Sequence, residues 1–257
     1  MNAVCVPHAA SQRKPRTLKG NSARGAGYLM RGARLLNHPS LRPFVLIPLA
    51  INTLIFGSLI ALGFSFISDL MDAMLSRIPA WLGFIQWILW PLIGITVSLI
   101  AGYLFTTVAL IIASPFNALL AEKAEELITG RPVESLEGLG AALLAIPKSI
   151  LRELKKLLYY LPMALIALLL SFIPGIGAMA WLLLGAWMMS IQFVDYPMDN
   201  HQLSFADVKA AVRSHRLSSL GFGGLVALCT GIPLVNFFVV PAAVVGATLL
   251  WCEELDQ

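Results

Sequence analysis

Long stretches without a charged residue dominate the chain, and two of them are interrupted in the same way. Residues 157–194 and 217–252 contain no Asp, Glu, Lys or Arg, and proline and glycine break each near its middle. The breaks fall at 173–177 and 231–236, which leaves limbs of roughly 14 to 17 residues, short of the ~20 that a spanning helix needs. Paired, interrupted segments are typical of a membrane transport site. The pattern predicts two helical hairpins that enter the membrane partway and return.

Two longer apolar stretches predict helices that cross the membrane fully, over about 43–68 and 87–121. Pro48 lies inside the first and predicts a kink or an end turn there. The second stretch is longer than a bilayer requires, so we expect this helix to tilt or to project into the cytoplasm, where Glu122 begins a charged segment.

The segments between these stretches are amphipathic or polar. A short helix from about residue 26, apolar on one side and basic on the other, is expected to lie at the membrane surface. Residues 141–158 alternate basic and apolar positions and predict an amphipathic cytoplasmic helix that leads into the first hairpin. Residues 195–216 are polar and predict a connection between the hairpins.

Composition fixes the class of protein. Of the 257 residues, 58% are hydrophobic and only 12% are charged, against ~25% charged in soluble proteins. So many apolar side chains with so little charge require lipid as solvent. We therefore predict an all-α integral membrane protein, with one helical membrane domain over residues 23–257 behind a basic, disordered tail of residues 1–22.

The distribution of charge predicts which ends face the cytoplasm. The net charge is +4, and seven Lys and Arg residues lie between positions 13 and 34, directly before the first span. A basic flank beside a span is typical of cytoplasmic loops, so we interpret it in this way and not as a nucleic-acid-binding patch. Both termini are then cytoplasmic. Re-entrant and fully inserted hairpins give the same loop sides, so charge does not separate them, whereas limb length favours the re-entrant form.

The sequence offers no constellation typical of catalysis or of metal binding. It contains no His-Glu-x-x-His, no Cys-x-x-Cys and no phosphate-binding glycine loop, so we predict neither an enzyme nor a bound cofactor. No acidic residue lies inside an apolar run, so a proton relay through the membrane has no evident carrier. This favours a passive facilitator over a proton-coupled symporter.

One candidate anion site lies where the first span begins, at Ser40-Leu41-Arg42. A serine cap followed by a helix start offers free backbone N–H groups and a partial positive charge to an anion. The Arg42 guanidinium would add a planar set of donors suited to a tetrahedral oxyanion. The alternative is that Arg42 extends to lipid headgroups and binds nothing else.

A second polar cluster follows the first hairpin, at residues 195–201. Its side chains could cap helix ends and hold a neighbouring element, which is the structural interpretation, or line a substrate path. Asn117 and Glu122 could reach Arg213 or Lys155 in the same layer, a contact that we interpret as architecture and not as substrate binding. The residues of a possible supporting polar network are Arg34, Asn117, Glu122, Asp195, Asp199, Asn200, His201 and Arg213.

Several strings of residues, taken together, resemble the CysZ-type sulfate permeases of bacterial inner membranes. The resemblance covers nearly everything from Gly27 to Trp251. The strings that carry it are Ser-Pro-Phe-Asn at 114–117, Leu-Leu-Ala-Glu at 119–122, Phe-Ile-Pro-Gly-Ile-Gly at 172–177, the polar string at 195–201, Pro-Leu-Val-Asn at 233–236, and 241–248.

The resemblance implies sulfate uptake that feeds cysteine biosynthesis, without ATP or a cofactor, by a homo-oligomer embedded in lipid. It also implies two long spanning helices and two helix pairs that enter the membrane partway. The family's sulfate site is a Gly-Leu-Arg-Arg or Gly-Ile-Arg-Arg string at the start of the first long helix. Here the string is Ser40-Leu41-Arg42-Pro43, so one arginine of the pair is missing. The alternatives are a non-transporting assembly or regulatory partner and, ranked last, a lipid-headgroup enzyme that uses Asp195, Asp199 and His201.

Overall fold

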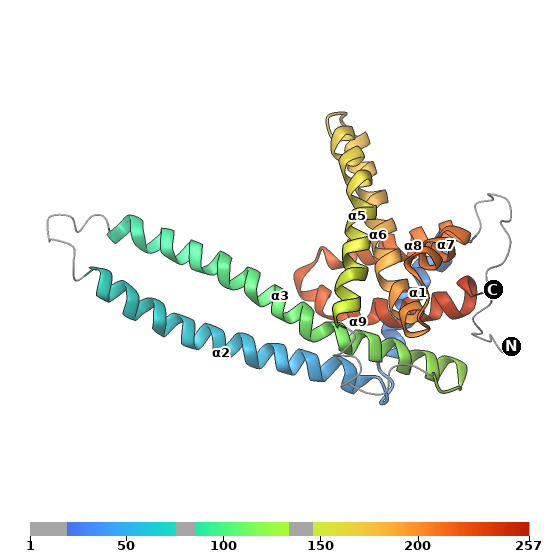
Figure 1. Ribbon diagram of the computed structural model, residues 1–257, viewed down its shortest axis with the longest axis horizontal. Coiled ribbons are helices and arrows are strands. Elements are labelled where there is room, and N and C mark those ends of the chain that lie inside the picture. The colour runs from blue at the N-terminus through green and yellow to red at the C-terminus, as the bar shows by residue number, and fades with distance from the viewer. Residues whose placement is uncertain (1–19, 76–85, 134–145, 257) are drawn as a thin grey trace. The chain divides into compact units, whose positions relative to one another are not determined.

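The computed structural model describes residues 20–75, 86–133 and 146–256, and within these ranges the chain forms helices joined by turns, with no strand (Figure 1). The predicted all-α class is confirmed. The chain divides into two compact units, one comprising Met1–Val45 with Asn117–Gln257 and the other Leu46–Phe116.

The unit Leu46–Phe116 consists of parts of two long helices, α2 (Arg42–Leu75) and α3 (Gln86–Thr129). Prolines at 48, 91 and 115 lie inside these helices and do not end them. Large apolar side chains such as Leu54 and Leu99 are about 70% exposed. Such exposure along a helix is favourable in hydrocarbon and costly in water. Helices α2 and α3 lie where the sequence predicted the two spans, and each begins before and ends after its predicted span.

The first hairpin consists of α5 (Ile146–Leu170) and α6 (Ile176–Asn200), which pack side by side (Figure 1). They are separated at the predicted break, where Gly175 has a φ of +82°, a value that glycine adopts without steric cost. From residue 146 on, the predicted amphipathic helix and the first limb form one continuous helix, α5, while positions 141–145 of the prediction lie outside the described residues. For this reason the basic positions of α5 are held rigidly beside the end of α6.

The second hairpin consists of α8 (Arg216–Thr230) and α9 (Pro233–Leu250), and it ends in a π-helical turn at Trp251–Leu255. Its break is where the sequence predicted it, and proline begins α9, a position that needs no N–H. The polar connection predicted over 195–216 is helical over most of its length. Helix α6 continues through Asn200, and α7 (Phe205–Ser214) follows, started by a capping box between Ser204 and Asp207.

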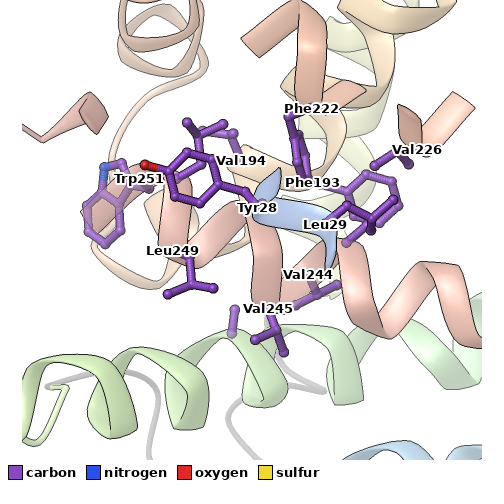
Figure 2. Packing of buried hydrophobic residues seen from close by; sticks show 14 of the residues in the cluster. Tyr28, Leu29, Phe193, Val194, Phe222, Val226, Val244, Val245, Leu249 and Trp251 are labelled. Atoms are coloured by element: carbon purple, nitrogen blue, oxygen red, sulfur yellow. The ribbon is translucent and has the colours of Figure 1, made fainter. Parts of the chain in front are cut away.

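The core of the larger unit forms around α1 (Ser22–Leu35), which packs against both α8 and α9. Tyr28 and Leu29 are almost completely buried among side chains of α6, α8 and α9, including Val194, Phe222 and Val245 (Figure 2). The sequence predicted that the apolar side of this helix would face the membrane surface. In the structure α8 and α9 cover that side.

Glycines allow these helices to approach closely. A methyl group at Gly32 of α1 would overlap the backbone of Ala242 and Gly246 in α9, and one at Gly223 of α8 would overlap the carbonyl of Ala186 in α6. Small residues at such crossings let backbones come into contact, which is how helices associate in a membrane without a hydrophobic driving force. The packing of α1 therefore depends on Gly32.

Among the described residues, three helical segments are long and apolar enough to cross a membrane, namely Arg42–Gly63, Ile176–Asn200 and Val235–Leu255. Helix α8, with 15 residues, is shorter. At 1.5 Å per residue it extends about 22 Å, less than the ~30 Å hydrocarbon core. Helix length thus favours partial insertion into the membrane for α8, whereas α6 is long enough to cross it.

We predict opposite effects for the same substitution at two glycines of α1. Gly32→Ala should destabilise the protein by about 1–3 kcal/mol, because the added methyl group overfills the crossing with α9. Gly27→Ala meets open space and should be neutral or stabilising by up to about 1 kcal/mol through helix propensity. Thermal unfolding of the two variants in detergent measures both effects, and equal melting temperatures would contradict the proposed packing.

Candidate functional site

A buried cluster of ion pairs joins α5 to α6 at the polar end of the hairpin. The Arg152 guanidinium contacts Asp195 through Nη2 at 2.5 Å and Asp199 through Nη1 at 2.6 Å, and Nη1 also donates to the Leu203 carbonyl at 2.9 Å. The Arg152 and Asp195 side chains are only 11% and 7% exposed. Two carboxylates from successive turns of α6 therefore bind one guanidinium of α5.

Lys156, one turn after Arg152 on α5, completes this cluster. Its ammonium lies 2.6 Å from Asp195 Oδ2 and 2.7 Å from Glu153 Oε1, and it donates to Gln192 at 3.3 Å. Its side chain is 3% exposed. Buried charges are tolerated when they are paired and hydrogen-bonded, as these are. The predicted supporting residues Asp195 and Asp199 thus bind basic side chains of α5, which gives them a structural part here.

We predict very different costs for removing the two carboxylates that contact Lys156. Asp195→Asn leaves two buried cations short of a partner and should destabilise the protein by about 3–5 kcal/mol. Glu153→Gln removes a partner that is 53% exposed and should cost at most about 1 kcal/mol. Thermal unfolding of the two variants is the measurement. Comparable losses would show that burial does not determine the strength of this network.

The string at 195–201 also contacts the end of α3, within the same unit. Asn200 donates to the Ala118 carbonyl at 3.0 Å, and Asn117 donates to the Tyr196 hydroxyl at 3.5 Å. Glu122 lies 3.8 Å from Lys123, and Arg213 donates to Tyr159. Asn117 and Glu122 thus contact Tyr196 and Lys123 and not Arg213 or Lys155, because α6 places its own polar side chains against α3.

His201 forms the last contact of this string. Its Nε2 lies 2.9 Å from Oε1 of Glu125, a buried carboxylate of α3, and its ring packs against Trp251 at 4.8 Å between centroids. The hydrogen bond to Glu125 raises the pKa of His201 above its usual value of 6.5, against the opposing effect of burial, and the charges of Glu125 and Asp256 add to the rise. His201 thus binds α6 to α3 most strongly as the imidazolium.

This raised pKa predicts a pH dependence of stability. The pair contributes its full stabilisation below pH 6.5, and the contribution is lost as the pH rises through the raised pKa of folded His201. The difference in melting temperature between the wild type and His201→Gln should therefore shrink as the pH increases from 6. Glu125→Gln should flatten the same pH dependence, and a Glu125→Gln protein that keeps the wild-type profile would exclude this pair as its source.

The predicted anion site at 40–42 occupies the turn between α1 and α2. Leu41 is fully buried, whereas Ser40 and Arg42 are exposed. Helix α2 begins at Arg42, so Ser40 lies one residue before the cap position that the sequence assigned to it. The N–H groups of Leu41 and Arg42 donate to the His38 carbonyl at 3.0 and 3.3 Å.

Neighbouring N–H groups in this turn are engaged as well. Ser40 donates to His38 Nδ1 at 3.4 Å and Phe44 to the Leu41 carbonyl at 3.2 Å, while Pro43 has no N–H. The free backbone donors that the sequence predicted are thus largely occupied. Within the described parts of the chain, the Arg42 guanidinium has no ion-pair partner, so it is the donor that remains for an anion.

Sequence reasoning missed Arg152, Lys156 and Glu125 as partners of the predicted polar residues. A signal existed in the spacing. Arg152 and Lys156 are four residues apart, as are Asp195 and Asp199, so each pair lies on one face of its helix. Two such pairs on helices of one hairpin indicate complementary faces.

Of the remaining predicted residues, Arg34 is exposed in the last turn of α1. Among the described residues, no group of three or more His, Cys, Asp or Glu gathers to hold a metal.

Comparison with known proteins now identifies the family. The family model described as Sulfate transporter CysZ/Etoposide-induced protein 2.4 matches residues 28–241. The chain belongs to this family. A relative named sulfate transporter CysZ from Pseudomonas paraeruginosa is 46% identical over 233 residues, which cover 90% of this chain and 95% of the relative. Sulfate transporter CysZ proteins of Vibrio cholerae and Pectobacterium atrosepticum are 41% and 40% identical over 91% and 90% of this chain.

Membership of the CysZ family agrees with the resemblance that the sequence strings indicated. The matched region begins inside α1 and ends inside α9, and it includes the first hairpin, α8 and the whole polar string. The ion-pair cluster therefore lies inside the part of the chain that defines the family, and the exposed apolar helices make it a membrane protein.

Proposed function

We propose that this protein transports sulfate across the bacterial inner membrane by a passive route and supplies sulfur for cysteine biosynthesis. The observation that carries the proposal is the similarity over 90% of the chain to proteins named sulfate transporter CysZ. Transport by a facilitator needs neither a cofactor nor a catalytic constellation, and we propose none.

The placement of acidic side chains supports a passive route. Neither hairpin contains an acidic residue between 157 and 194 or between 217 and 252 up to its π-helical turn. The buried acids at the polar end of the first hairpin and of α3 contact basic side chains, Asp195 those of Arg152 and Lys156, and Glu125 that of His201. These carboxylates lie outside the uncharged stretches, where a proton relay through the membrane would need a carrier.

We propose that sulfate binds at Arg42, with the Ser40 hydroxyl as a second donor. The buried Leu41 anchors the turn that presents both side chains. A guanidinium that is free of acidic partners keeps its planar donors available to a tetrahedral oxyanion. Because a second arginine is absent, Arg42 would contribute most of the charge. Arg34 is a further exposed guanidinium that could support it.

Ion pairs between α1 and the C-terminal turn support a location of both chain ends on the same side of the membrane. Arg24 lies 3.0 Å from Glu254 Oε1, and Arg31 lies 2.5 Å from Glu253 Oε1. These contacts support the proposal that the residues just before the first span and just after the last hairpin share one side of a membrane. The basic flank favours the cytoplasmic side. We further propose a homo-oligomer, as the family resemblance implies.

The test is sulfate flux into liposomes that contain only this protein. We expect entry of labelled sulfate above that into empty vesicles, with no added nucleotide and no pH difference across the membrane. Flux that appears only with a proton gradient would instead indicate a symporter. Absence of flux under both conditions would favour a non-transporting assembly partner.

Arg42→Ala tests the site. Loss of a charge-assisted contact of about 1.5–3 kcal/mol predicts sulfate binding roughly 10- to 100-fold weaker, measured by calorimetry on purified protein. Arg131→Ala is the matched control, because Arg131 is also exposed and, like Arg42, has no ion pair among the described residues. Equal affinities of the two variants would remove Arg42 from the site.

A further inference from the structure

A cavity of about 380 Å³ opens at the foot of the first hairpin, where α5, α6, α7 and α8 meet. Its walls are mostly apolar, with Met163 from α5, Leu183 and Leu184 from α6, and Leu220 from α8. Two guanidiniums, of Arg213 and Arg216, line the same cavity. An apolar pocket with two cations calls for a ligand with both an apolar and an anionic part.

No acidic side chain of the described ranges neutralises the positive charge in this cavity. Arg213 donates to the Tyr159 hydroxyl at 3.3 Å, and neither it nor Arg216 has an ion pair within the described ranges. The acids on neighbouring helices are otherwise engaged. Asp207 of α7 binds Ser204 in the capping box, and Glu153 of α5 binds Lys156.

Other groups around the cavity add to its positive character and mark the level of a membrane interface. The Lys209 ammonium lies 4.9 Å from the ring centroid of Tyr159, a cation–π contact that adds a third positive charge beside the cavity. Trp187 donates to the Tyr159 hydroxyl at 3.2 Å. This hydroxyl thus accepts from Trp187 and Arg213 and keeps its own proton for a ligand acceptor. Trp and Tyr with basic side chains are typical of the headgroup layer.

The apolar wall continues onto the outside of the hairpin. Leu183 is 50% exposed and Met179, one turn nearer the hairpin tip, is 58% exposed. An acyl chain that leaves the cavity along α6 would therefore cover side chains that otherwise face solvent. A free inorganic oxyanion gains nothing from such walls and loses hydration beside them.

We propose that this cavity binds an anionic phospholipid. Its phosphate lies between Arg213 and Arg216 and accepts from the Tyr159 hydroxyl, and an acyl chain follows Met163 and Leu183. Basic pockets between membrane helices are suited to such headgroups. The site is separate from the proposed sulfate site at Arg42. In this proposal Arg213 binds a lipid phosphate, whereas the sequence had suggested that Arg213 supports sulfate binding.

The experiment compares phosphatidylglycerol with phosphatidylcholine on the full-length protein in detergent, with bound lipids counted by native mass spectrometry. The wild type should retain phosphatidylglycerol preferentially. Arg213→Gln/Arg216→Gln should bind it roughly 30-fold more weakly, since each basic side chain near an anionic lipid contributes about fivefold. Arg34→Gln/Arg131→Gln removes the same charge from exposed arginines outside the cavity and should bind phosphatidylglycerol as the wild type does.

Two further measurements separate the possible occupants. Phosphatidylcholine binding and the circular dichroism spectrum should be unchanged in Arg213→Gln/Arg216→Gln, which shows that the variant folds. Inorganic sulfate and glycerol phosphate should not displace phosphatidylglycerol at millimolar concentration. Displacement by either would identify a site for free oxyanions and overturn the lipid assignment. Equal phosphatidylglycerol binding by the two double variants would overturn it as well.

Discussion

The ion pairs of Asp195 with Arg152 and Lys156 are the interaction on which the polar end of this fold depends. They hold three charges together in a buried layer, where an isolated charge is very costly, and the more exposed Asp199 and Glu153 bind the same two cations. Because both cations come from α5 and the carboxylate from α6, the pairs also fix how far one limb of the hairpin can slide along the other. The hairpin tip at Gly175 fixes the opposite end.

This constraint reaches the end of α3 and the C-terminus through the same turn of α6. Asn117, Asn200 and His201 join α6 to α3, and the ring of His201 packs against Trp251 of the π-helical turn. That turn carries Glu253 and Glu254, which bind Arg31 and Arg24 of α1. One polar layer thus connects the amphipathic helices, while glycine-mediated contacts pack their apolar sides. In lipid, where apolar burial gives little specificity, polar contacts and close packing determine which helices are neighbours.

The sequence predicted the elements of this fold better than their partners. The uncharged stretches located both hairpins, because a break at Pro174-Gly175 or Gly231-Ile232-Pro233 is a local property of the chain. The apolar side of α1 was also evident, but whether lipid or protein covers it depends on residues some 200 positions away, such as Phe222 and Val245. Likewise, the string at 195–201 was identified as a polar cluster that could clasp a neighbour. Of its partners, Arg152 left a signal in the four-residue spacing of both charged pairs, whereas Glu125 could not be identified without the fold that brings it to His201.

The arginines of the chain divide into two groups, and this division bears on function. Arg24, Arg31 and Arg152 have acidic partners, so their donors are engaged by the protein itself. Within the described ranges, Arg42, Arg213 and Arg216 have none. A guanidinium without a carboxylate beside it remains available for an anion from outside, and its surroundings determine which anion fits.

Arg42 is exposed at a helix start with a serine hydroxyl nearby, which suits a hydrated oxyanion such as sulfate. Arg213 and Arg216 line an apolar cavity that opens onto the hairpin surface, which suits a lipid phosphate with its acyl chain. Both proposed sites rest on the same chemistry, and the apolar surroundings of Arg213 and Arg216 distinguish the second from the first.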